Sequence, residues 1–168
     1  MSAFHLAQVN IGRILGPIDS AVMSGFVAQL DEINALAESS PGFVWRLKTE
    51  DGDATAIRPY DDDRIIVNMS VWESPEALHA YVYQSAHVEV MRRRREWFSR
   101  MTDAFMALWW VPAGHRPPVT EAVERLAHLR AHGPTPVAFT FRQRFPAPDD
   151  PASLDTERAD LSDGCPAL

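Results

Sequence analysis

The chain has 168 residues, 46% hydrophobic and 23% charged, which is the composition of one ordinary globular domain. No apolar run approaches the roughly 20 residues of a membrane span, and the single cysteine, Cys165, excludes a disulfide framework and a cysteine-based zinc site. The N-terminus lacks the basic and apolar segments of a signal peptide, so we expect a cytoplasmic protein without a membrane partner.

The formal net charge of -7 is unevenly distributed. Residues 146–168 hold six acidic residues and one basic residue, which leaves 17 acidic and 15 basic residues in 1–145. A body this close to neutral argues against a nucleic-acid partner, which would require a strongly basic face. We expect one domain over residues 1–145, followed by an acidic, proline-rich tail over 146–168 that is disordered.

Six elements follow one another in the first two thirds of the chain. Alternating or β-rich residues predict strands over 4–13, 43–49, 64–72 and 105–111. A helical apolar spacing covers 21–37, and Ser74-Pro75 begins a second helix. The order strand, helix, strand, strand, helix, strand predicts an α+β fold with a ferredoxin-like antiparallel sheet and helices on one face.

An extension follows the sixth element. Thr120 is expected to cap an extra helix that runs to about His132 and is ended by Gly133-Pro134. Residues 136–145 are expected to form a fifth strand.

The strands over 64–72 and 105–111 are apolar on both alternating faces. Helices of a ferredoxin-like sheet cover one face only, so something else must cover the other. The simplest cover is a second copy of the same sheet, which predicts a homodimer with face-to-face sheets.

Four consecutive arginines lie in the stretch AHVEVMRRRREWF, residues 86–98. At 100° per residue, Arg94 falls with Met91 on the apolar face that carries His87, whereas Arg93 points to the far side. Arg92 and Arg93 are therefore expected to face water and pair with nearby glutamates. The preceding stretch, 76–84, has a different phase, which predicts a break near Gln84-Ser85.

A histidine and an arginine on an internal face need partners. Asn10 on the first strand, Arg46 on the second and Asn68 beside Trp72 on the third are polar candidates. Together they predict a small-molecule pocket. The alternative is a core His87, an Arg94 that extends to solvent or pairs with Glu50 or Glu73, and tryptophans that are only core and dimer contacts.

His128 and His132 have a spacing that could hold a metal, but no third ligand is evident, and the end of a short exposed helix explains them equally well. We therefore expect no metal site and no cofactor.

The stretch VNMSVWESPEALHAYVYQSAH, residues 67–87, resembles the strand-to-helix segment of antibiotic-biosynthesis-monooxygenase-like proteins, which form dimeric α+β barrels. Residues 3–146, through the segments FHLAQVN, SPGFVWRL, MRRRREWF, LWWVPAGH and GPTPVAFTFRQRFP, are more closely similar to a bacterial family of unknown function within that superfamily.

The resemblance implies a dimer with a pocket between each sheet and its helices. Superfamily members include cofactor-free oxygenases, haem-degrading oxygenases and lactone isomerases. In the haem-degrading branch, a strand-one asparagine and a helix aromatic match Asn10 and Tyr81. The place of the iron-ligating histidine falls at Met91 or Arg92, which argues against haem degradation and leaves His87 as an alternative iron ligand.

Three functions follow from these expectations. The first is a cofactor-independent monooxygenase or isomerase in which His87 takes a proton and Arg94 and Asn10 stabilise the resulting anion. The second is a non-catalytic ligand-binding homodimer, and the third is a haem protein that uses His87. In the enzyme hypothesis Trp72 and Trp109 form the pocket walls, and the other expected ligand contacts are Asn68, Arg46, Tyr81 and Met91.

Overall fold

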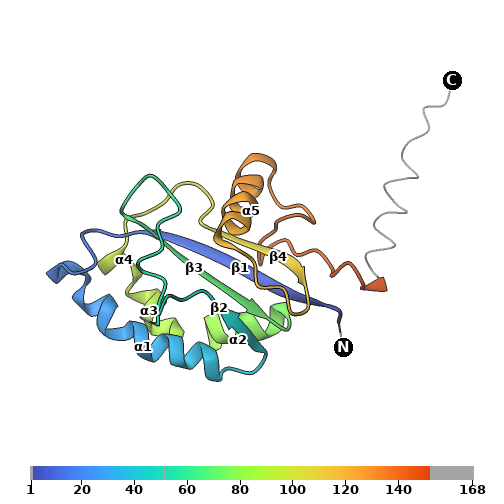
Figure 1. Ribbon diagram of the computed structural model, residues 1–168, viewed down its shortest axis with the longest axis horizontal. Helices are drawn as coiled ribbons and strands as arrows, with labels where there is room; N and C mark the ends of the chain where they lie inside the picture. Colours follow the sequence, from blue (N-terminus) through green and yellow to red (C-terminus); the bar gives the residue numbers. More distant parts are fainter. Residues whose placement is uncertain (1, 51, 152–168) are drawn as a thin grey trace.

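The computed structural model describes residues 2–50 and 52–151. Its centre is a four-stranded antiparallel sheet with the strand order β2-β3-β1-β4 (Figure 1). The strands are β1 (Phe4–Arg13), β2 (Phe43–Arg46), β3 (Ile65–Trp72) and β4 (Met106–Pro112). A helical crossover joins β1 to β2 and another joins β3 to β4, so the predicted α+β, ferredoxin-like arrangement is confirmed.

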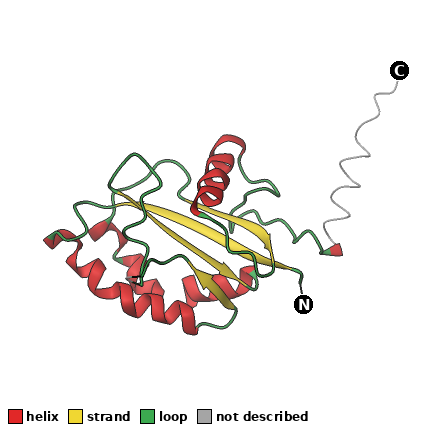
Figure 2. Ribbon diagram, viewed as in Figure 1, coloured by secondary structure: helices red, strands yellow, loops and turns green. Residues whose placement is uncertain are grey.

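The helices lie in two layers on opposite sides of the sheet (Figure 2). One layer holds the 3-10 turn η1 (Ala21–Met23) and the helices α1 (Ser24–Ser39), α2 (Pro75–Gln84), α3 (His87–Arg92) and α4 (Arg94–Trp97). The other layer is α5 (Val119–His132). We call the two faces of the sheet the helix-layer face and the α5 face.

The predicted break between Gln84 and the next helix is present and has a local cause. Ser85 is extended, with φ -110° and ψ 179°, so it cannot continue α2. Its hydroxyl donates to the carbonyl of Tyr81 and accepts from the backbone N–H of His87, 3.2 Å away. One serine therefore satisfies a backbone group at the end of α2 and another at the start of α3.

The α5 face is buried by the same chain. Nine sheet side chains on this face are at most 4% exposed: Ala7, Val9, Ile11, Val67, Met69, Val71, Ala107, Trp109 and Val111. Ala122, Leu126 and Leu129 of α5 belong to the same apolar cluster. The expectation that a second sheet covers this face is therefore wrong, because α5, together with Leu47, Ile57 and Tyr60, already fills the position that the partner was expected to take.

The C-terminal extension differs from prediction in three places. Residues 136–145 form no strand, since β4 pairs with this segment only through the isolated bridge between Leu108 and Phe139. The extra helix begins at Val119 and has no side-chain cap, so Thr120 lies inside it. Part of the predicted tail is ordered: the Asp149 carboxylate accepts from the backbone N–H of Ala3 at 2.7 Å.

The rest of the predicted tail, 152–168, lies outside the described residues. Within the described ranges, none of the helices combines the length and apolarity needed to cross a membrane.

Candidate functional site

The helix-layer face is packed at both ends and open in the middle. One apolar cluster surrounds Trp72 at one end of β3, and a second surrounds Ile66 at the other. Ile66 is 8% exposed and Trp72 is 0% exposed, whereas Asn68 between them is exposed. Exposure in the middle of a central strand means that the helices do not close over this position. We call the region around Asn68 the central opening.

Asn10 on β1 is paired directly with Asn68 on β3, and both lie on the helix-layer face. The buried Gln8 links them: its Nε2 donates to Asn68 Oδ1 at 2.8 Å, and its Oε1 accepts from Asn10 Nδ2 at 3.2 Å. These bonds leave Asn10 Oδ1 and Asn68 Nδ2 without a hydrogen bond among the described residues. The opening therefore offers one acceptor and one donor on neighbouring strands.

The row of polar groups continues toward the Trp72 end. Gln8 Nε2 also donates to Ser70 Oγ at 2.9 Å, and Trp72 Nε1 donates to the same hydroxyl at 2.8 Å. Ser70 is 6% exposed and Gln8 4%, so this part of the network is buried and fixed. It holds the two asparagines in one orientation.

Helix α1 spans both apolar clusters and carries a polar group that the sequence analysis missed. Phe26 packs edge-on against Phe98 at 5.1 Å, and the Ile33 carbonyl accepts from the Tyr81 hydroxyl at 3.3 Å. Gln29 lies between these two positions on the same helical face. Its Oε1 is buried and has no hydrogen-bond partner among the described residues. A lone glutamine on an otherwise apolar helix face was the signal in the sequence.

His87 lies at the Trp72 end of the opening. Its ring is 4.8 Å from that of Tyr81, which stacks on Trp72 at 5.1 Å. His87 Nδ1 is 3.3 Å from the Val82 carbonyl, and because a carbonyl only accepts, the proton of this bond lies on Nδ1. Nε2 then carries the lone pair. Burial lowers the pKa of His87, and the Val82 bond offsets part of this effect, so the ring is a neutral proton acceptor near pH 7.

Arg94 lies at the opposite end. Its guanidinium is 5.1 Å from the Phe98 ring and 4.7 Å from the Phe105 ring, and it donates one long hydrogen bond, 3.4 Å, to the Ile11 carbonyl. Burial lowers the pKa of Arg94. Among residues 2–50 and 52–151, no carboxylate lies within ion-pair distance of it, so neither Glu50 nor Glu73 is its partner.

The other arginines of the run behave as predicted. Arg92 pairs with Glu89 at 2.8 Å, and Arg93 pairs with Glu96 at 2.9 Å, all four with exposed side chains. The run therefore does not form one basic patch.

His87 and Arg94 are not in contact, although the sequence placed them on one helical face. The helix is interrupted at Arg93, between α3 and α4, and α4 ends at Trp97. His87 contacts Tyr81 of the Trp72 cluster, whereas Arg94 contacts Phe98 of the Ile66 cluster. The two groups flank the central opening from opposite ends.

The remaining predicted contacts have four different environments. Arg46 lies on the helix-layer face, but its Nε donates to Glu38 at 2.8 Å, so its charge is compensated. Burial strongly raises the pKa of Tyr81, which stays a neutral phenol. Met91 is 39% exposed. Trp109 lies on the α5 face with Nε1 bonded to Glu121 at 2.9 Å, so it does not form a wall with Trp72.

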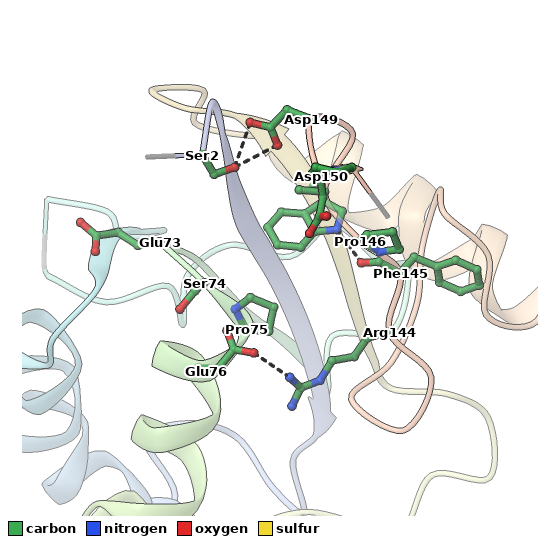
Figure 3. A pocket seen from close by; sticks show the side chains of 13 residues that line it. Ser2, Glu73, Ser74, Pro75, Glu76, Arg144, Phe145, Pro146, Asp149 and Asp150 are labelled. Carbon is green, nitrogen blue, oxygen red and sulfur yellow. Dashed lines mark hydrogen bonds and ion pairs between the residues drawn. The ribbon is translucent and has the colours of Figure 1, made fainter. Parts of the chain in front are cut away.

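Two hollows elsewhere on the molecule contain none of the predicted site residues. One, of about 560 Å³, lies between the start of α2 and residues 144–151 (Figure 3). Polar groups there already pair with one another: Arg144 reaches Glu76 at 3.2 Å, and Asp149 accepts from Ser2. The other, of about 490 Å³, lies between Ile57–Pro59 and the start of α5 and is largely apolar.

His128 and His132 stack with ring centroids 4.5 Å apart, and His128 Nε2 bonds to Thr135 Oγ1 at 3.0 Å. In the part of the chain that the structure describes, no three His, Cys, Asp or Glu side chains are grouped to hold a metal ion.

These features define a class: an α+β protein of ferredoxin-like topology whose sheet carries a row of polar side chains on its helix-layer face. The chain belongs to the family described as "Domain of unknown function (DUF3291)", whose model matches residues 5–155. The resemblance to a family of unknown function is thereby confirmed. No curated protein matches the chain.

Several solved structures are similar to it. SnoaB from Streptomyces nogalater, a cofactor-independent oxygenase, shares 19% identity with a TM-score of 0.45, covering 69% of this chain and 99% of SnoaB. A putative antibiotic biosynthesis monooxygenase from Chloroflexus aurantiacus shares 16% at a TM-score of 0.43, covering 68% and 98%. Rv0793 from Mycobacterium tuberculosis shares 15% at a TM-score of 0.42, covering 68% and 99%.

Proposed function

We propose that the central opening binds a small, planar, polar organic molecule and that His87 removes a proton from it. The supporting observation is the pair of asparagines on an otherwise covered sheet face, where Asn10 Oδ1 and Asn68 Nδ2 form no hydrogen bond among the described residues. The helix layer on this side also holds a buried acceptor without a described partner, Gln29 Oε1. A ligand with complementary donors and acceptors can bond to Asn10 and Asn68 in place of water.

The proposed reaction is that of a cofactor-independent monooxygenase or isomerase acting on a hydroxylated aromatic or enolisable compound. His87 Nε2 is the base, because Nδ1 is engaged with Val82 and the ring is neutral near pH 7. Asn68 Nδ2 donates to the enolate or phenolate oxygen that forms, and Arg94 adds positive charge at the far end. Trp72 and Tyr81 form the apolar wall beside His87.

All of these groups come from one chain. The proposed chemistry therefore does not require a second copy, and a homodimer, if it forms, uses a surface other than the filled α5 face.

The test uses hydroxynaphthalenes and cyclic diketones as probes, with the wild type, Asn68→Leu, His87→Gln and the exposed-surface control Arg93→Gln. Binding is measured by NMR, oxygen uptake with an electrode, and proton abstraction by deuterium incorporation from solvent. We expect Asn68→Leu to lose binding, and His87→Gln to bind but to turn over about 100-fold more slowly. Binding and turnover in both variants that match Arg93→Gln would refute the proposal.

Saturable, Asn68-dependent binding without conversion of any probe would instead support the non-catalytic alternative. A haem protein is the second candidate, because a histidine whose Nδ1 is held by a backbone carbonyl presents Nε2 for iron. The residues at this place would supply one axial ligand, His87, to a haem iron. Hemin titration of the wild type and His87→Gln decides this: a stoichiometric Soret shift that disappears in the variant would favour haem.

A further inference from the structure

We infer that the ligand of the central opening is an organic anion, held through a carboxylate or a group of like charge by Arg94. This inference rests on the proposed function and specifies the class of compound that the site takes.

Arg94 is a charged group without a counter-charge. Every described acidic group that forms an ion pair does so with another base, and Arg94 is absent from these pairs. Its neighbours in the run, Arg92 and Arg93, each have a glutamate three residues away. Half-burying a cation without a partner costs stability, so a partner supplied by a ligand is the simplest account of this arrangement.

The guanidinium is positioned rather than free. It lies over the rings of Phe98 and Phe105, and its one described hydrogen bond is the long contact to the Ile11 carbonyl. A guanidinium has five N–H donors, so most of them remain available in a fixed plane. This is the geometry that binds a carboxylate with two parallel hydrogen bonds.

The position of Phe98 connects Arg94 to the opening. A Cβ on Gly12 would lie 2.6 Å from Cδ1 of Phe98, so the ring rests directly on the backbone of β1 at Gly12. Gly12 is two residues from Asn10 on the same sheet face, a separation of roughly 7 Å. A planar ligand that contacts Asn10 and Asn68 can therefore extend a charged group toward Arg94 and present its other end toward His87.

Two other charged residues at this face do not compete for the anion. Arg46 is already paired with Glu38. Lys48 is 52% exposed and lies 3.5 Å from the same glutamate.

The test compares salicylate with salicylamide, which has the same ring and hydroxyl but no charge. Both are titrated by heteronuclear NMR into wild type, Arg94→Met, Arg94→Lys and the matched control Arg93→Met, and the side-chain signals of Arg94, Asn10 and Asn68 are followed. Thermal melts verify that each variant is folded.

We expect salicylate to bind wild type and Arg93→Met equally and Arg94→Met about ten-fold or more weakly, because a charge-assisted bidentate contact is lost. Arg94→Lys keeps the charge but loses the two parallel N–H donors of the guanidinium, so its affinity for salicylate should be intermediate. Salicylamide should bind all four proteins weakly and alike.

Equal binding of both compounds, with shifts at Asn10 and Asn68 but none that depend on Arg94, would overturn the anion preference and leave the proposed site intact. The absence of shifts at all three side chains with either compound would overturn both.

Discussion

Replacing Leu126 by alanine tests the most consequential feature of the fold, the cover that α5 gives to the sheet. Leu126 is 0% exposed and packs against the α5 face. Removing three carbons costs about 0.8 kcal/mol each, and the cavity left behind brings the total to about 3 kcal/mol. For a chain of this length that corresponds to a fall in melting temperature of roughly 6–12 °C.

The measurement is urea unfolding and a thermal melt of Leu126→Ala, with Glu124→Ala as the control. Glu124 is exposed on the same helix, so its replacement should change stability by no more than about 0.5 kcal/mol. Because the cover comes from the same chain, the loss should not depend on protein concentration. A loss below about 1 kcal/mol would refute the cover by α5, and a loss that shrinks as concentration rises would indicate that a second copy covers the sheet in solution.

Three further predictions concern the helix-layer face. Ser70→Ala should destabilise the protein by about 1–3 kcal/mol in urea unfolding, because Trp72 Nε1 loses its acceptor inside the core. The control is Ser39→Ala at an exposed site, and an equally small effect of both variants would contradict the role of Ser70 in the buried hydrogen-bond network. Gly12→Ala should destabilise the protein by about 1–3 kcal/mol and weaken salicylate binding, because the added Cβ would lie 2.6 Å from the Phe98 ring. Unaltered salicylate binding would show that the position of Phe98 does not matter for Arg94. The pKa of folded His87 lies below its unfolded value, so its contribution to stability is present above about pH 6.5 and is lost on acidification. Between about pH 7.5 and 5.5, the melting temperature of His87→Gln should therefore fall less steeply than that of the wild type. Parallel curves would refute this.

Local patterns in the sequence predicted most of the fold. The strand and helix order, the start of α2 at Pro75 and the break at Ser85 depend on neighbouring residues, and each was found. Helical spacing also predicts that Arg93 and Arg94 point in different directions. The pairing of Arg93 with Glu96 can be predicted because the two residues lie three apart, within one helical turn.

The errors concern contacts between elements that are distant in the chain. Strand β4 is apolar on both faces, so its sequence does not say whether Trp109 or Trp110 shares a side with Trp72. The register answers this: Leu6 pairs with both Trp72 and Trp110, which sends Trp109 to the α5 face. In the same way, the sequence showed that a second cover was needed but not that α5 folds back to provide it.

The site itself could be predicted only in part. Strand alternation predicts that Asn68 shares a face with Trp72, whereas the direct pairing of Asn68 with Asn10 depends on the register between β1 and β3. His87 and Arg94 were placed together by assuming one continuous helix, which the interruption at Arg93 invalidates. The apolar spacing of α1 does not reveal Gln29, because a single glutamine on a helix face can equally extend its amide to solvent.

The central opening is costly to the fold, and this cost is the best argument that it has a purpose. A buried acceptor without a partner, such as Gln29 Oε1, costs about 1–3 kcal/mol, and an uncompensated half-buried cation such as Arg94 adds to it. An apolar residue at position 68 would continue the run from Ile66. Proteins tolerate such departures mainly where a ligand offsets them, and here both lie on the helix-layer side of the sheet.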